Sequence, residues 1–465
     1  MAEIKFGTDG WRAIIADDYT IENVKRVAEA TAKWLLNKNS RKIVIGYDCR
    51  FGGRMFSECT AKVMGHFGIK SLISTDFVTT PMVSLATIKT GSSAGVVITA
   101  SHNPPSYNGY KLKSAEGGPM IPKQIEEVEQ LIPEKAINVL PTITELKDKG
   151  LIEYVDMEDM YLMHVYKSFD MEAINESGIR IAYDAMYGAG QSVAKKIFKN
   201  ATFLHCEFNP SFLGQAPEPI HRNLGELSEK MSKNEDLRMG LANDGDADRI
   251  GLYDENGKFV DSHHILLLLL YYMKAYKGMD GKVIVTFSVT DKMEKLAKHF
   301  DLEIEVTKIG FKYIAEIMLN EDVLVGGEES GGLAVKGHIP ERDGIWIGLV
   351  ILEFMAKTGK SLKQLIQEVY QLVGSFHCDR DDLHISQELK ESVVEKCSNA
   401  HYSNFGKYEV QKIEKIDGFK FWLADSQWVM IRPSGTEPVL RVYAQDVDKA
   451  ATRALLDTVG QVILN

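Results

Sequence analysis

Three short apolar runs, each rich in β-branched residues, recur along the chain at 41–48, 178–184 and 281–287. Near-continuous apolar runs of this length are typical of strands that are buried on both faces of a parallel sheet. Helical patterns follow, as at 53–65 and 191–198, and further strand-like segments come after them. The pattern therefore predicts three α/β units of related design.

Each predicted unit also contains a strand that runs into a polar or glycine-rich loop. Residues 95–98 lead into a loop that contains Ser101, and 239–242 lead into a loop with three aspartates. Residues 323–325 lead into the glycine-rich segment 326–332. Open α/β sheets bind ligands at the carboxyl ends of their strands, so these loops are the first places to look for a site.

The character of the chain changes near Gly374. Beyond it, 419–423 and 427–431 are strand-like, and the stretch 442–463 ends in a helical pattern, which predicts a fourth domain of α+β type. The borders between domains are expected near 133–150 and 255–262. The predicted domains are 1–145, 146–257 and 258–373, all α/β, and 374–465, which is α+β.

Composition narrows the class of protein. With 465 residues, 45% of them hydrophobic, the chain can bury several cores. A net charge of −11 argues against a nucleic-acid or anionic-membrane partner. Five scattered cysteines without a CxxC motif indicate reduced thiols. Because no basic-then-apolar signal opens the sequence and the apolar run 265–273 is too short to span a bilayer, we expect a cytoplasmic protein.

The segment Thr99-Ala-Ser-His-Asn-Pro104 places one hydroxyl at a strand end. A serine is a weak nucleophile unless a base or a cation assists it. His102 is adjacent, but neighbours on an extended chain point to opposite sides, so the alternative is an ordinary turn serine before an Asn-Pro breaker. Lys111 is either a solvated lysine or a cation that returns to the same site.

The segment Asp244-Gly-Asp-Ala-Asp-Arg249 places a carboxylate at every second position. Alternation in an extended loop directs all three to one side, which suits a hard cation such as Mg²⁺. The segment is not an EF-hand, because the glutamate at the twelfth position is missing. Arg249 is suited to a phosphate. The alternative is an acidic surface turn.

Two later loops add polar groups. Glu328 and Ser330 could accept hydrogen bonds from sugar hydroxyls, and 432–436, with Arg441 nearby, could form an anion nest or an ordinary hairpin turn. Together the four loops supply the parts for moving a phosphoryl group. Neither a GxxxxGK[ST] nor a GxGxxG motif occurs, so a kinase is disfavoured.

These motifs resemble the α-D-phosphohexomutase superfamily, and the resemblance covers essentially the whole chain in order. The opening Phe6-Gly-Thr-Asp-Gly-Trp-Arg12 is similar to the family's N-terminal motif. The resemblance implies three related mixed-sheet α/β/α units and a C-terminal α+β domain in a heart-shaped arrangement. The segments that match the family's signature loops are 99–104, 244–249, 327–332 and 432–436.

The resemblance also implies a role for each matched residue. Ser101 would carry a phosphoryl group, and Asp244, Asp246 and Asp248 would bind Mg²⁺ together with it, while Arg249 would contact the phosphoserine. Arg12, Lys111 and His102 are the further catalytic candidates, and Glu328 and Ser330 would bind the sugar. The predicted phosphate-binding residues are Arg432, Ser434, Gly435, Thr436 and Arg441.

The implied activity is that of an isomerase, an intramolecular phosphotransferase acting between C1 and C6 of an aldohexose phosphate. Glu328-Glu-Ser330 resembles the glucose-specific members, so the expected reaction interconverts glucose 1-phosphate and glucose 6-phosphate, with glucose 1,6-bisphosphate as intermediate and activator. Gly332 stands where the mannose/glucose and glucosamine branches usually have histidine. Gly310, Lys312 and His338 are candidate substrate contacts.

Several alternatives stay open at this point. Within the class they are a phosphomannomutase or a dual-specificity enzyme, followed by a phosphoglucosamine mutase or a phosphopentomutase. Outside it they are a metal-dependent phosphatase with an aspartate nucleophile and a non-catalytic sugar-phosphate sensor. The expected partner is a hexose phosphate, and the chain is expected to be a monomer or a homodimer.

Overall fold

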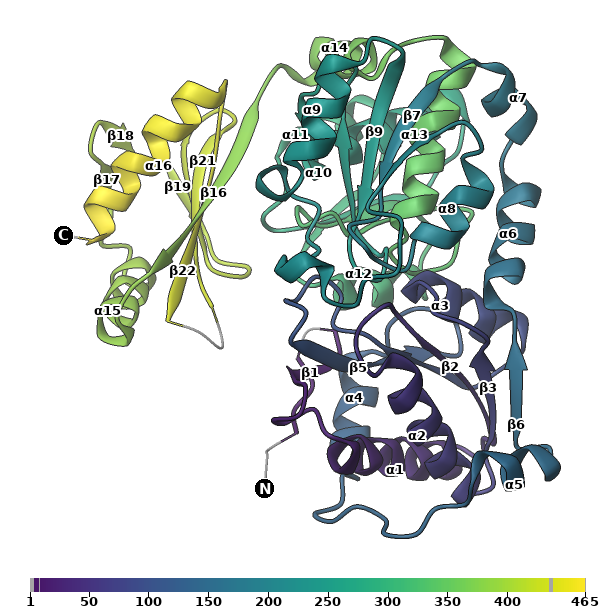
Figure 1. Ribbon diagram of the computed structural model, residues 1–465. Helices are drawn as coiled ribbons and strands as arrows, with labels where there is room; N and C mark the ends of the chain where they lie inside the picture. Colours follow the sequence, from purple (N-terminus) through teal and green to yellow (C-terminus); the bar gives the residue numbers. More distant parts are fainter. Residues whose placement is uncertain (1–3, 8, 435–437, 465) are drawn as a thin grey trace. The chain divides into compact units, whose positions relative to one another are not determined.

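The computed structural model describes residues 4–7, 9–434 and 438–464 (Figure 1). The chain forms two compact units, and each is described by itself. The first unit contains 1–262 and 310–365, and the second contains 263–309 and 366–465. None of the described helices combines the length and the hydropathy that crossing a bilayer requires.

The first sheet of the first unit has the strand order β1-β5-β4-β2-β3-β6. β2 is parallel to β3 and to β4, as predicted, whereas β5 is antiparallel to its neighbours β4 and β1. This order brings the end of β4 next to the middle of β5. The strands are β1 (Trp11–Ile14), β2 (Lys42–Tyr47), β3 (Lys70–Ser74), β4 (Ala94–Ile98), β5 (Tyr107–Ser114) and β6 (Ile152–Val155).

Helices cover this sheet, and α1 and α2 lie side by side (Figure 1). β6 pairs with β3 although it lies beyond the predicted domain end at 145, and α5 lies inside the predicted linker, so the first sheet extends further than expected. β6 has only four residues and follows the charged segment Lys147-Asp-Lys-Gly150, so the sequence pattern was interpreted as a linker. The helices are α1 (Ile21–Asn37), α2 (Gly53–His66), α3 (Thr80–Lys89), α4 (Pro122–Glu129) and α5 (Ile143–Asp148).

The second sheet of this unit has the order β11-β10-β9-β7-β8. β7 is parallel to β8 and β9, as predicted, and β10 turns back antiparallel to β9. The strands are β7 (Arg180–Asp184), β8 (Thr202–Leu204), β9 (Leu237–Asn243), β10 (Ile250–Tyr253) and β11 (Phe259–Val260). The helices here are α6 (Met157–Ser168), α7 (Met171–Glu176), α8 (Gln191–Ile197) and α9 (Gly225–Lys233), with 3₁₀ turns at Phe212–Gly214 and His221–Asn223.

The remainder of the first unit is a hairpin between two helices. β14 (Val323–Gly327) pairs antiparallel with β15 (Leu333–Val335), after α12 (Phe311–Met318) and before α13 (Gly344–Thr358). The Asp343 carboxylate accepts a hydrogen bond of 3.0 Å from the Trp346 amide and so caps α13. Residues 328–332 of the predicted loop 326–332 are the turn of this hairpin, and Gly326 and Gly327 belong to β14.

The second unit contains a parallel strand pair and an antiparallel sheet of order β16-β22-β21-β20-β19. The predicted domain 258–373 is therefore divided between the two units. Part of the stretch 442–463 is strand, because β22 precedes the last helix. The elements are α10 (Ser262–Tyr271), a π-helical turn (Tyr272–Tyr276), β12 (Lys282–Thr286), α11 (Lys292–His299), β13 (Ile304–Thr307), α14 (Leu362–Val373), β16 (His377–His384), α15 (Gln387–Ser398), β17 (Asn404–Phe405), β18 (Tyr408–Glu409), β19 (Lys412–Glu414), β20 (Phe419–Ala424), β21 (Gln427–Pro433), β22 (Val439–Asp446) and α16 (Lys449–Leu464).

Candidate active site

The Ser101 loop follows β4 directly and holds its serine in a left-handed conformation, with φ of 52°. A non-glycine residue adopts this conformation only where the surroundings enforce it. The Ser101 amide donates to Thr99 Oγ1 at 2.8 Å, and Thr99 Oγ1 donates to Asp48 Oδ2 at 2.5 Å. The Ser101 hydroxyl donates to Asp244 Oδ2 at 2.7 Å. The structure thus brings the predicted nucleophile and the aspartate loop into contact.

Arg50, which the sequence analysis did not single out, binds the backbone of the same loop. Its guanidinium donates to the carbonyl oxygens of Ser101 and Asn103, each at 2.6 Å, and to those of Pro104 and Tyr107 at 2.9 and 3.1 Å. Arg50 is 2% exposed, so these bonds form away from competing water. Its place three residues after the end of β2 is the signal that could have identified it.

The aspartate loop gathers its three carboxylates as predicted, with one oxygen from each within 4.8 Å of the others. The expectation of an extended loop is wrong, because Ala247 has a φ of 56° and its amide donates to the Asp244 carbonyl at 3.1 Å. The carboxylates meet around a turn instead. A Cβ on Gly245 would lie 2.5 Å from the Ser101 carbonyl oxygen, so only glycine allows this approach.

The hydrogen bonds of the cluster leave room for a cation. Lys111 Nζ donates to Asp246 Oδ2 at 2.8 Å and to Asp248 Oδ2 at 3.0 Å. The other oxygen of each carboxylate, Asp246 Oδ1 and Asp248 Oδ1, is buried and accepts no hydrogen bond from any described residue. Buried carboxylate oxygens without partners are unusual, and carboxylates are the ligands that Mg²⁺ prefers. The donor set therefore fits a magnesium ion.

Burial and neighbouring charges shift the pKa values of Asp244, Asp246 and Lys111. Burial, together with Asp248 and Asp246, raises the pKa of Asp244 well above its usual value. Burial also acts to raise the pKa of Asp246, but the ion pair with Lys111 outweighs it and lowers the pKa. For Lys111, burial opposes the charge, yet Asp246, Asp248 and Asp9 raise its pKa above the usual value. Lys111 is therefore a fixed cation at neutral pH.

Asp9 of the N-terminal loop joins this network and was not predicted. Its carboxylate lies 2.8 Å from Lys111 Nζ and pairs with Arg342. Burial acts to raise the pKa of Asp9, but Lys111, Lys113 and Arg342 lower it well below its usual value. Asp9 therefore stays ionised, with lysine ammonium groups and the Arg342 guanidinium around it. Arg12, from β1, donates to Asn103 Oδ1 at 2.7 Å, which places it beside the Ser101 loop.

His102 lies closer to the serine than an extended chain would allow. Its Nδ1 is 3.3 Å from Ser101 Oγ, because the left-handed conformation of Ser101 turns the chain. Burial, with Arg249 and Arg12, lowers the pKa of His102 well below its usual value. The imidazole is therefore neutral at neutral pH.

The predicted sugar loop, residues 327–332, is joined to the aspartate loop through backbone contacts. The Ile250 amide donates to the Gly331 carbonyl at 3.2 Å, and Arg249 forms an isolated antiparallel bridge with Gly332. Glu328 is 6% exposed, and burial raises its pKa to about 7 even though Arg342 acts to lower it. Ser330, two residues further on, is half-buried. Two predicted loops, one carrying Arg249 and one carrying Glu328, are therefore neighbours.

The guanidinium of Arg249 makes few hydrogen bonds or ion pairs with the described residues. Its amide donates to Asp244 Oδ1 at 3.0 Å, and its Nη1 lies 3.9 Å from Glu218 Oε1. Its Nε is buried and donates to no described residue. This arginine is consequently able to bind an anion next to Asp244.

The candidate substrate contacts have different surroundings. Lys312 lines a cavity of about 160 Å³ with Asp9 and Gly10, and Gly310, with φ of 134°, precedes α12. The His338 side chain is 2% exposed, stacks on Trp346 with ring centroids 3.8 Å apart, and lies 2.9 Å from an Asp343 oxygen. The structure thus places Lys312 near the N-terminal loop and encloses His338 within the protein.

The predicted phosphate loop belongs to the second unit. Arg432 on β21 lies directly opposite Arg441 on β22, and Arg432 Nε donates to Asp417 Oδ1 at 3.1 Å. The Ser434 carbonyl accepts a hydrogen bond of 2.5 Å from Lys390. Residues directly opposite in an antiparallel pair carry their side chains on the same face of the sheet, so the two arginines are neighbours on one face. Gly435 and Thr436 lie outside the described residues.

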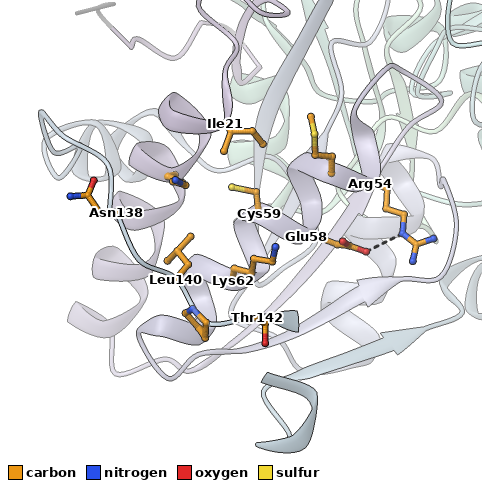
Figure 2. A pocket seen from close by; sticks show the side chains of 11 residues that line it. Ile21, Arg54, Glu58, Cys59, Lys62, Asn138, Leu140 and Thr142 are labelled. Atoms are coloured by element: carbon orange, nitrogen blue, oxygen red, sulfur yellow. Dashed lines mark hydrogen bonds and ion pairs between the residues drawn. The ribbon is translucent and has the colours of Figure 1, made fainter. Parts of the chain in front are cut away.

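A separate cavity of about 570 Å³ lies between α1, α2 and the segment 138–142 (Figure 2). Lys25, Lys62 and Arg54 line it, and Arg54 Nε is 3.0 Å from Glu58 Oε1. None of the predicted site residues lines this cavity.

Family models match the chain along most of its length, in order. They are the phosphoglucomutase/phosphomannomutase α/β/α domains I, II and III, at residues 3–138, 159–257 and 261–373, and the C-terminal domain at 390–461. The chain belongs to the phosphoglucomutase/phosphomannomutase family, within the α-D-phosphohexomutases. It is accordingly an intramolecular phosphotransferase, as the sequence predicts.

Two relatives and one solved structure align with nearly the full length of this chain. The phosphoglucosamine mutase of Carboxydothermus hydrogenoformans is 30% identical over 472 residues, covering 98% of each chain. A phosphoglucomutase/phosphomannomutase of Thermococcus kodakarensis is 28% identical and covers 97% of this chain and 96% of its own. A structure from Thermus thermophilus, described as a "putative phosphomannomutase", has a TM-score of 0.89 at 30% identity and covers 100% of each chain. These similarities confirm the predicted four-domain fold.

Proposed function

We propose that this chain interconverts α-D-glucose 1-phosphate and glucose 6-phosphate through a phosphoserine at Ser101 and a glucose 1,6-bisphosphate intermediate. The observation that carries the proposal is the 2.7 Å contact between Ser101 Oγ and Asp244, inside a buried group of three aspartates. The sugar loop with Glu328 is bonded to the same aspartate loop. These contacts support the proposal, because they bring the proposed nucleophile, cation ligands and sugar ligand together in one unit.

In this proposal Asp244, Asp246 and Asp248 hold Mg²⁺ together with the phosphorylated Ser101. When bound, the ion offsets negative charge on the phosphoryl oxygens. Arg249 Nε, which donates to no described residue, is available to the same phosphoryl group. Lys111 keeps its proton and limits the repulsion between Asp246 and Asp248.

Transfer breaks the bond between phosphorus and Ser101 Oγ and forms one between phosphorus and the free sugar hydroxyl. The hydroxyl proton passes to His102 or Glu328, since His102 is neutral and the pKa of Glu328 is about 7. A proton is returned to Ser101 Oγ as it leaves phosphorus, so the serine becomes a hydroxyl again. The bisphosphate then turns over, its other phosphoryl group returns to Ser101 Oγ, and the proton returns to the sugar oxygen. The chain therefore ends in the phosphorylated state in which it began.

The phosphate that does not react needs a second anion site. We assign it to the predicted phosphate-binding loop of the second unit, where Arg432 and Arg441 face each other. Planar guanidinium groups bind phosphate through paired hydrogen bonds. The same loop must accept either end of the sugar, because the substrate presents its C1 and C6 phosphates in turn.

A second candidate function is phosphoglucosamine mutase, since similar relatives carry that name. An amino sugar presents an ammonium group where glucose has the C2 hydroxyl, and a buried carboxylate such as Glu328 could bind either. The Glu-Glu-Ser sequence of the predicted sugar loop favours glucose. Phosphomannomutase or dual activity is the third possibility within the same chemistry.

The test compares kcat/KM for the 1-phosphates of glucose, mannose, glucosamine and ribose, with a catalytic amount of glucose 1,6-bisphosphate present. We expect the highest value for glucose 1-phosphate. A higher value for glucosamine 1-phosphate would establish the second candidate instead. Release of inorganic phosphate without isomerisation would contradict both and indicate a phosphatase.

A further inference from the structure

Arg342 connects parts of the first unit that are far apart in the sequence. It precedes α13, is 5% exposed, and places Nη2 2.8 Å from Asp248 Oδ2. The same guanidinium pairs with Asp9 of the N-terminal loop, and its Nε lies 3.5 Å from Glu341 Oε1. One buried side chain therefore bridges the N-terminal loop and the aspartate loop.

The stem of Arg342 lies over Gly332 of the sugar loop. A Cβ on Gly332 would be 2.6 Å from Arg342 Cδ and 3.2 Å from Glu328 Oε2. The backbone of Gly332 does not have the positive φ that favours glycine, so the limit at this position is space. The absence of a side chain at 332 is what allows Arg342 to pass beside Glu328 and reach Asp248.

Two further contacts define what Arg342 can do. Lys111 also bonds Asp248 Oδ2, at 3.0 Å, so Arg342 is not the only charge on this carboxylate. The guanidinium carbon lies 5.3 Å from the centre of the Phe311 ring, which adds a further contact to hold the planar group in place. Lys111 already supplies a positive charge to Asp248. The further contribution of Arg342 is therefore to hold the Asp248 carboxylate in one orientation.

We propose that Arg342 is a positioning residue that fixes Asp248 and the Glu328 loop relative to each other, and that residue 332 is glycine because the Arg342 stem takes the place of a side chain. The inference rests on the proposed function, in which Asp248 holds the cation and Glu328 the sugar. Partners that orient a metal ligand typically change metal affinity about 10- to 100-fold when they are replaced.

The test is a double-mutant cycle read by calorimetric titration of the full chain with Mg²⁺. Gly332→Ala and Arg342→Ala should each weaken Mg²⁺ binding by about 10-fold or more. The double variant should bind no more weakly than Arg342→Ala alone, because the added methyl group has no stem left to displace. Gly225→Ala at the start of α9 is the matched control, since nothing lies within 4 Å of its Cβ, and it should leave Mg²⁺ affinity unchanged.

Additive effects in the cycle would overturn the inference, as would an unchanged Mg²⁺ affinity in Arg342→Ala. Thermal unfolding without Mg²⁺ checks that each variant is folded. If Arg342→Ala does not fold, Arg342→Lys decides: it keeps the charge without the planar fork, so wild-type Mg²⁺ affinity in that variant would refute a positioning role. A wild-type chain that binds no Mg²⁺ would overturn this inference together with the metal assignment. A chain that isomerises none of the hexose phosphates while the cycle holds would contradict the proposed function alone.

Discussion

Replacing Lys111 by methionine removes a charge from the centre of the site while keeping most of the side-chain volume. Lys111 is fully buried, and its Nζ lies 2.8, 3.0 and 2.8 Å from oxygens of Asp246, Asp248 and Asp9. Lys111→Met would leave these three carboxylates facing one another without that cation. We therefore expect a loss of stability that depends on whether Mg²⁺ is present.

The distances set the size of the effect. At about 3 Å and an effective dielectric constant near 20, each ion pair is worth about 5 kcal/mol before the cost of burying the lysine is subtracted. Removing one partner of a buried ion pair costs about 3–5 kcal/mol in practice, and we expect a loss in this range without metal. Bound Mg²⁺ replaces part of the missing charge, and ligand at about 100 times its Kd stabilises a protein by about 2.7 kcal/mol.

The assay is calorimetric unfolding of the wild type and the variant, in EDTA and in excess Mg²⁺. The matched control is Lys113→Met, because Lys113 is fully buried two positions further on β5 and pairs with Glu341 at 2.6 Å. Both variants should be destabilised in EDTA, but only Lys111→Met should gain more from Mg²⁺ than the wild type does. Equal responses of the two variants to Mg²⁺ would refute the idea that Lys111 and the ion share the same carboxylates.

Other expected outcomes can be measured with standard assays. Ser101→Ala should fold normally and lose mutase activity by orders of magnitude, because a loop hydroxyl contributes little to stability; normal turnover would exclude Ser101 as nucleophile. EDTA should abolish activity and Mg²⁺ restore it, and indifference to chelation would count against the aspartate site. Burial raises the pKa of Glu328 to about 7. The wild type should therefore lose stability as the pH rises from about 4.5 to 7, because the folded state favours the protonated carboxyl. The free energy of unfolding of Glu328→Gln should fall by about 3 kcal/mol less over the same pH range. Denaturant midpoints near pH 5 and pH 8 check this, and parallel pH profiles would contradict it.

The local features of the fold were predictable from sequence. The runs at 41–48, 178–184 and 281–287 are the strands β2, β7 and β12, because continuous apolar stretches need burial on both faces. The loop carrying Ser101 and the loop carrying three aspartates were found because their residue types are unusual within a few positions. Each follows a strand, as expected.

The residues that were missed depend on contacts between distant segments. Asp9 and Arg342 are 333 positions apart, and no local pattern pairs them. Arg50 acts on carbonyl oxygens, which carry no sequence signal, although its place at a strand end could have been noted. The approach of His102 to Ser101 depends on a left-handed backbone that L-residues rarely adopt, so an extended chain was the reasonable expectation.

The most direct test locates the phosphoryl group after reaction. The wild-type chain is incubated with glucose 1,6-bisphosphate and Mg²⁺, quenched in acid and digested, and the phosphorylated peptide is sequenced by mass spectrometry. The account predicts phosphate on Ser101. Phosphate on Asp244 or Asp246, with Ser101 unmodified, would contradict it.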